Sequence, residues 1–200
     1  MFIIDPWFIL ALAGVLLLGR FFPTRAQVIT SISIVFVAVY VIASAVSHNL
    51  ALFKLYDSAR KIGIGWTRMS ALPQPLSLFA WDGLIQTEDG VLQTFYSVFD
   101  DGPQQFSISP HAKDEFVEKA LQNPDLQWYM SFARHPSIRS FQDGERHVVE
   151  VRDLMFSIDG TLMKSLGFAE RSLPFVLTCT YDSAGNLLEV KFDGKEIREE

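Results

Sequence analysis

From Ala26 to Phe53 the chain runs for 28 residues without a lysine, arginine, aspartate or glutamate, and most of these residues are apolar. A bilayer core about 30 Å thick is crossed by roughly 20 apolar residues of α-helix, at about 1.5 Å each. A helix in a 200-residue soluble domain does not need so long an apolar run. The sequence therefore predicts a membrane-spanning helix over residues 27–53.

A second apolar segment, Pro6 to Gly19, comes before this run. Asp5 suits the N-cap of a helix and Pro6 its first position, where a missing N–H costs nothing. The leader holds an acid and no base, unlike a signal peptide, so we expect a retained helix over about residues 6–22. The two segments together predict a transmembrane hairpin over residues 1–54, with the lipid bilayer as its partner.

The charged residues lie almost entirely after the hairpin. Residues 1–49 hold only Asp5, Arg20 and Arg25, which leaves 15 basic and 22 acidic side chains, a net charge of −7, for residues 50–200. An acidic domain is a poor partner for nucleic acid, and none is expected. The single cysteine, Cys179, excludes an internal disulfide and is expected to lie in the core.

Basic residues near the helix ends indicate the orientation of the hairpin. The loop between the two helices has two basic residues near the helix ends, Arg20 and Arg25. The segment after the second helix has more: Lys54, Arg60, Lys61 and Arg68. The positive-inside rule then places the C-terminal domain in the cytoplasm.

The rest of the chain predicts an α+β fold. The second helix is expected to continue to about Arg60, and glycines and prolines mark a juxtamembrane linker that completes residues 55–74. Residues 75–196 alternate short strands with turn signals and contain two helices, which open at Ser109-Pro110 and Asn123-Pro124. This pattern predicts a soluble domain with a mostly antiparallel sheet. The expected strands are 76–85, 91–99, 105–109, 137–141, 147–158, 175–181 and 188–192.

Few residues carry obvious chemistry. No pair among the four histidines has metal-ligand spacing, and no linear catalytic motif is present, so no metal ligand is predicted. On the strand 147–158, Asp153 shares a face with valines, where an unpaired carboxylate is costly, while Arg152 points the other way. Asp153 is either a structural group, paired or at a strand end in water, or a binding or catalytic carboxylate. His48 is either an interfacial residue or part of a polar site. Two further pairs are expected at element ends: Trp81-Asp82 and Arg134-His135.

Four short motifs occur in an order that resembles one family. They are Phe2-Ile3-Ile4-Asp5-Pro6-Trp7, Leu72-Pro73-Gln74-Pro75-Leu76 with Trp81, Phe95-Tyr96-Ser97, and Val151-Arg152-Asp153-Leu154. The chain resembles the C-terminal part of the membrane-bound metal-dependent hydrolase-like family, a poorly characterised group of prokaryotic inner-membrane proteins.

The resemblance implies a multi-pass inner-membrane protein. In that family a divalent metal is implied by His and Asp residues on earlier membrane helices, to which no position of this chain corresponds. We therefore expect an accessory domain without the metal-binding front half, which a partner protein could supply, with Asp5, His48 and Asp153 at the edge of a shared polar site. Arg152 and Asp153 match the family's Arg-Asp motif. The alternative hypothesis is a non-catalytic, membrane-tethered module that binds a protein or a lipid.

Overall fold

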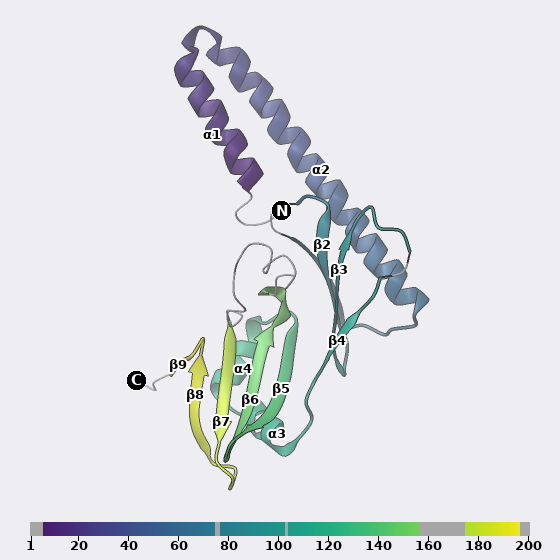
Figure 1. Cartoon of the computed structure of the whole chain (residues 1–200), viewed down its shortest axis with the longest axis vertical. Helices are drawn as coiled ribbons and strands as arrows, with labels where there is room; N and C mark the ends of the chain where they lie inside the picture. Colours follow the sequence, from purple (N-terminus) through teal and green to yellow (C-terminus); the bar gives the residue numbers. More distant parts are fainter. Residues whose placement is uncertain (1–5, 75–76, 103, 157–174, 197–200) are drawn as a thin grey trace. The chain divides into compact units, whose positions relative to one another are not determined.

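The computed structural model describes residues 6–74, 77–102, 104–156 and 175–196 of the chain (Figure 1). These residues divide into two compact units. The first, the helical unit, comprises the described parts of Met1–Ile64, Ala71–Gly83 and Phe95–Gln104. The second, the sheet unit, comprises those of Gly65–Ser70, Leu84–Thr94 and Gln105–Glu200.

Two antiparallel helices open the helical unit. Helix α1 spans Pro6–Phe21, a 3-10 turn η1 covers Pro23–Arg25, and α2 runs without a break over Ala26–Lys61. Phe8 of α1 packs on Tyr40 of α2, with ring centroids 6.0 Å apart. The helix expected to reach about Arg60 thus ends one residue later.

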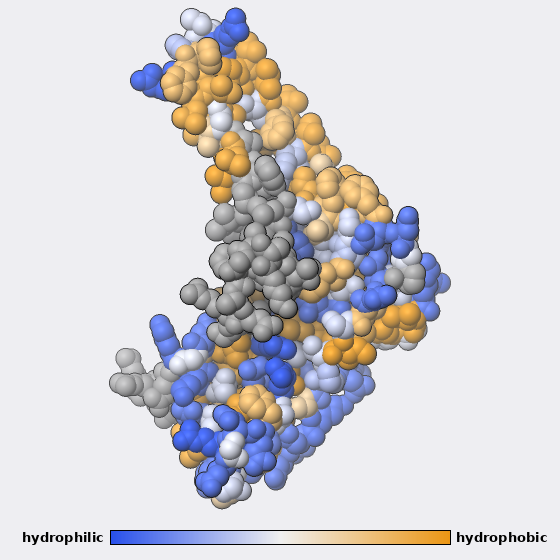
Figure 2. Space-filling model, in the orientation of Figure 1, coloured by the Kyte–Doolittle hydropathy of each residue, from blue (hydrophilic) through white to orange (hydrophobic). Residues whose placement is uncertain are grey.

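Within the described residues, one helix is long and apolar enough to cross a membrane, and it is α2 together with η1. Only 11% of its most apolar 18-residue window is buried within the chain. Helix α1 has 16 residues and reaches about 24 Å, short of a typical bilayer core. The predicted hairpin of two membrane-spanning helices is therefore not confirmed. Figure 2 shows the apolar surface that covers α1 and the adjoining part of α2.

From Tyr40 onward, α2 carries a stripe of buried side chains on one face, and most of them are small. Its buried residues recur every three or four positions, the spacing of a single helix face. Here the Trp81 indole N–H donates to the Ser47 hydroxyl, which in turn donates to the Leu78 carbonyl oxygen. Small residues let the strand segments of the helical unit approach the helix backbone closely. The stripe consists of Tyr40, Ser44, Ser47, Ala51, Leu55, Ser58 and Ala59.

The first sheet has four strands in the order β1-β2-β3-β4. They are β1 (Arg68–Pro73), β2 (Ala80–Gln86), β3 (Gly90–Ser97) and β4 (Ser107–Pro110), and their residues are shared between the two units. Strand β1 lies where the sequence predicts a linker. Trp81 and Asp82 lie inside β2 and not at an element end.

The second sheet belongs to the sheet unit and is antiparallel throughout, in the order β5-β6-β7-β8-β9. Helices α3 (Glu115–Leu121) and α4 (Pro124–Phe132) cover one face of it and are capped by the side chains of Asp114 and Asn123. The core includes Val149, Val151 and the fully buried Cys179, as predicted. The strands are β5 (Pro136–Asp143), β6 (Arg146–Asp153), β7 (Val176–Tyr181), β8 (Leu187–Phe192) and β9 (Lys195–Glu196).

The fold class is α+β, as predicted, but with two antiparallel sheets in place of one. Strand β6 was expected to continue to Ile158, and it ends at Asp153, where the 3-10 turn η2 (Leu154–Phe156) begins. The reason lies in the Asp153 side chain, which binds the backbone of this turn. Ile158 itself lies outside the described residues.

Candidate functional site

Asp153 is 5% exposed, and its carboxylate accepts hydrogen bonds from three backbone amides. The N–H groups of Arg134 and His135 donate over 2.8 and 3.1 Å, and that of Met155 donates over 3.0 Å. The carboxylate thereby ties the segment after α4 to the end of β6. Of the two interpretations left open, this geometry favours the structural one, with backbone amides as the partners of the carboxylate. A carboxylate that accepts three N–H groups has little capacity left to bind a substrate or a metal.

His135, whose backbone N–H donates to Asp153, is fully buried. Its ring Nε2 lies 2.8 Å from the Ser70 hydroxyl oxygen. Burial lowers the pKa of His135 to about 4, so the ring is neutral at pH 7. The arrangement contains a serine, a histidine and an aspartate. However, the Asp153 carboxylate binds backbone amides, and no described residue is a hydrogen-bond partner of the ring Nδ1. It therefore lacks the aspartate-to-Nδ1 bond that orients a catalytic histidine.

Arg152 lines a pocket of about 360 Å³, termed here the Arg152 pocket, within the sheet unit. Residues that alternate along β6 face opposite sides, so Arg152 lies on the face away from the core that holds Val151. Ser137 of β5 is paired directly opposite Arg152 and therefore shares its face. The pocket is also lined by Ser109, His111, Arg139 and Ser140.

The Arg152 pocket contains buried polar atoms without a partner in the described part of the chain. They are the hydroxyl of Ser137, which is 0% exposed, the Nε of Arg152 and the Nδ1 of His111. Unpartnered buried polar atoms are rare, since each costs about 1–3 kcal/mol. All three line one cavity, which makes the Arg152 pocket the best candidate for a ligand site.

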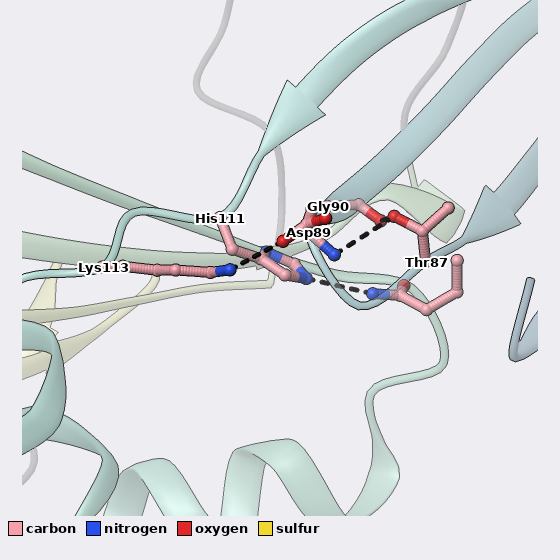
Figure 3. Close-up of polar contacts among 6 residues, drawn as sticks. Thr87, Asp89, Gly90, His111 and Lys113 are labelled. Carbon is pink, nitrogen blue, oxygen red and sulfur yellow. Dashed lines mark hydrogen bonds and ion pairs between the residues drawn. The ribbon is translucent and has the colours of Figure 1, made fainter. Parts of the chain in front are cut away.

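His111, one of the residues that line this pocket, is held by a hydrogen-bonded turn, whose contacts are drawn in Figure 3. The backbone N–H of His111 donates to the Asp89 carbonyl oxygen over 2.8 Å, and the Lys113 ammonium pairs with the Asp89 carboxylate at 2.6 Å. The Gln86 amide nitrogen lies 3.1 Å from His111 Nε2. Burial, and secondarily Lys113, lower the pKa of His111, so the ring is neutral at pH 7. With the Gln86 amide nitrogen as the donor in this contact, Nε2 accepts and Nδ1 carries a proton that no described residue accepts.

His48, the third residue predicted from the sequence, lies in the helical unit. Its ring packs on Trp81, with centroids 5.3 Å apart, and it lines a mostly apolar cavity of about 260 Å³ with Ser44 and Ala71. Arg152 and Asp153 belong to the sheet unit, so the structure does not describe a single site that contains all three residues. Asp5 lies outside the described residues. No group of three His, Cys, Asp or Glu side chains that could hold a metal occurs among those described.

Comparison with known proteins gives no relative: no family model, no curated protein and no solved structure matches this chain. The candidate site therefore depends on geometry alone. Sequence reasoning singled out Arg152 and missed Ser137 and His111, which the fold brings to the same cavity. The alternation of residues along the strand around Ser137 could have predicted which face of the sheet Ser137 lies on. The position of His111 depends on the turn at Asp89.

Proposed function

We propose that this chain is a non-catalytic binding module held at the inner membrane by α2, with its sheet unit in the cytoplasm. The observation that carries the proposal is the continuity of α2. One unbroken helix begins with a charge-free, exposed apolar segment and ends with a stripe that packs on strands. Exposed side chains in the first part include Ile32, Val35 and Val39, which are about 60% exposed. Lipid is the solvent that such a surface favours.

The polar side chains in this first part are compatible with lipid. The hydroxyls of Thr30, Ser31 and Ser33 each donate to the backbone carbonyl oxygen four residues earlier, over 2.7–3.0 Å. In a bilayer every polar group must find a partner within the protein, because no water is present. These internal hydrogen bonds meet that requirement without a second protein.

We further propose that α1 completes a multi-pass hairpin. Arg20 lies in the last turn of α1 and Arg25 lies in η1, and both can extend along the apolar surface to reach lipid headgroups. This extension offsets part of the difference between a helix of about 24 Å and a core of about 30 Å.

The Arg152 pocket is the proposed binding site of the module. Asp153 does not supply a free carboxylate there, because backbone amides occupy it. The pocket instead offers donors, which recognise and orient a ligand. Binding is thus the role that these side chains support best.

Membrane flotation after an alkaline carbonate wash tests the tether. The full chain should float with the membranes. A Val35→Arg/Val39→Arg variant should lose much of that fraction, because each arginine near the middle of a span costs about 2.5–3.5 kcal/mol. Ile62→Arg, at the exposed end of α2, is the matched control and should float like the wild type. Recovery of the wild-type chain as a soluble monomer would contradict the proposal.

A second candidate function follows from the resemblance to the hydrolase-like family, in which the chain is an accessory domain completed by further membrane helices. The feature that favours it is the cavity beside His48 and Ser44, on the helix that would meet such partners. The test is metal content and ester or phosphoester hydrolysis, measured with and without a co-expressed membrane partner. Metal and activity that appear only in the complex support this candidate, whereas a metal-free, inactive complex refutes it.

A further inference from the structure

We infer that the Arg152 pocket binds a tetrahedral oxyanion, the phosphate group of a small molecule. The inference deepens the proposed binding role by naming the chemistry of the ligand. It depends on the residues of the sheet unit and does not require the membrane tether.

The first argument is the supply of donors. Arg152 Nε, the Ser137 hydroxyl and His111 Nδ1 are buried, unpartnered within the described residues, and line one cavity. A guanidinium only donates hydrogen bonds, and the His111 Nδ1 carries a proton when Nε2 accepts from the Gln86 amide. The Ser137 hydroxyl can also donate. A ligand rich in acceptors therefore satisfies all three atoms at once.

The second argument is charge. Arg152 and Arg139 both line the pocket, and the Arg139 guanidinium lies 3.8 Å from the Glu150 carboxylate. The pair is partly exposed, where such pairs are weak, so it offsets the positive charge of Arg139 only in part. Two guanidinium groups in a chain of net charge −6 make this pocket a local site of anion attraction.

The third argument is shape. The donors come from three segments, β5, β6 and the residue after β4, and a phosphate presents acceptor oxygens in several directions. A planar carboxylate offers its acceptor sites mainly in one plane, whereas a tetrahedral group offers them in three dimensions. The volume, about 360 Å³, lies at the small end of ligand pockets and suits a small phosphorylated molecule.

The test uses the purified full chain in detergent with inorganic phosphate as the probe. Thermal unfolding and calorimetric titration are compared for phosphate, acetate and chloride at equal ionic strength. We expect saturable binding and a rise in Tm with phosphate only. Arg152→Met should weaken binding at least about tenfold, because a hydrogen bond to a charged group contributes about 1.5–3 kcal/mol. Arg146→Met, on the same strand but outside the pocket lining, should change it less than about twofold.

A structural role for Arg152 predicts a different result. In chloride, Arg152→Met should then lower Tm, whereas removal of an unpartnered buried donor leaves Tm unchanged or raises it. Arg152→Lys keeps the positive charge but not the planar guanidinium with its several N–H donors. Its affinity for phosphate should lie between those of the wild type and Arg152→Met. Ser137→Ala provides a second variant at the opposite side of the pocket and should also weaken phosphate binding.

Three results would overturn the inference: no phosphate binding by the wild type, equal binding by Arg152→Met and Arg146→Met, or equal stabilisation by acetate. Flotation of the same preparations separates this inference from the proposed tether. A chain that floats but ignores phosphate refutes only the phosphate site, and a chain that binds phosphate but stays in the supernatant refutes only the tether.

Discussion

The Tyr96 hydroxyl donates a buried hydrogen bond over 2.8 Å to the carbonyl oxygen of Ala51, a residue inside α2. This bond joins the end of β3 to the helix within the helical unit. Ala51 is 0% exposed, and a larger residue at that position would prevent the approach. The helix that carries the apolar segment is therefore also a packed structural element, and not a flexible leader.

Tyr96→Phe removes this donor and should lower the free energy of unfolding by about 1–2 kcal/mol, because a buried carbonyl oxygen loses a partner. Thermal unfolding in detergent measures the change. Tyr181→Phe is the matched control, since the Tyr181 ring is also buried, and should cost less. Equal effects of the two substitutions would show that the bond to Ala51 adds no stability.

Asp153→Ala should destabilise the sheet unit by about 3 kcal/mol or more, because three buried N–H groups lose their acceptor. Asp153→Asn keeps one acceptor oxygen and should cost less. Denaturant unfolding in detergent measures both variants. If Asp153→Ala leaves the free energy of unfolding unchanged, the three backbone hydrogen bonds of Asp153 add no stability. The interpretation of this carboxylate as a free binding group would then be open again.

The stability of the chain should fall as the pH is lowered from about 6.5 to about 4, in part because of His135. Burial lowers the pKa of His135 in the folded chain to about 4, from 6.5 for the exposed ring, so the unfolded chain binds the proton first. The contribution is complete above pH 6.5 and is lost as the pH falls through this window, by on the order of 2–3 kcal/mol. Unfolding of the wild type at pH 7 and pH 4.5 measures it.

His135→Asn removes the titrating group and should flatten the pH dependence in this window. His111→Asn does not serve as a control for this experiment, because burial also lowers the pKa of His111 and its removal can change the pH dependence too. Equal pH slopes for the wild type and His135→Asn would show that His135 is not titrated by unfolding.

Gly90→Ala should be strongly destabilising. Gly90 has a φ of 156°, and a Cβ there would meet the Ser109 carbonyl oxygen at 2.4 Å, which is shorter than van der Waals contact allows. Gly90 and Ser109 lie on the paired strands β3 and β4, so β4 must shift, and His111 with it. Gly144→Ala, at a φ of 62° with open space around it, should show only backbone strain of about 1 kcal/mol. Thermal unfolding compares the two, and equal losses would contradict the close approach.

The sequence predicted α2, α4 and most strands, because caps such as Asn123 and alternating apolar positions act locally. It also predicted α3 but began it at Ser109-Pro110, which lie in β4, whereas α3 begins at Glu115 after the cap residue Asp114. It predicted the core face of β6 correctly, including the inward position of Asp153. The partners of that carboxylate are backbone amides, two from the segment after α4 and one from η2, and amides leave no trace in a sequence pattern. The division into two sheets and the meeting of His111 with Ser137 depend on long-range pairing, which local patterns do not encode.

The most direct test of the membrane tether is the accessibility of cysteines placed along α2. Cys179 is fully buried, and burial raises its pKa to about 11, so it should not react in the folded chain. Any labelling of a variant with one added cysteine therefore reports on the added cysteine. Ile32 and Ile62 are 65% and 51% exposed within the folded chain itself. In open native membranes, a water-soluble maleimide should label Ile62→Cys at least about tenfold faster than Ile32→Cys, because lipid covers only Ile32. Equal labelling rates at the two positions would contradict a membrane-spanning α2.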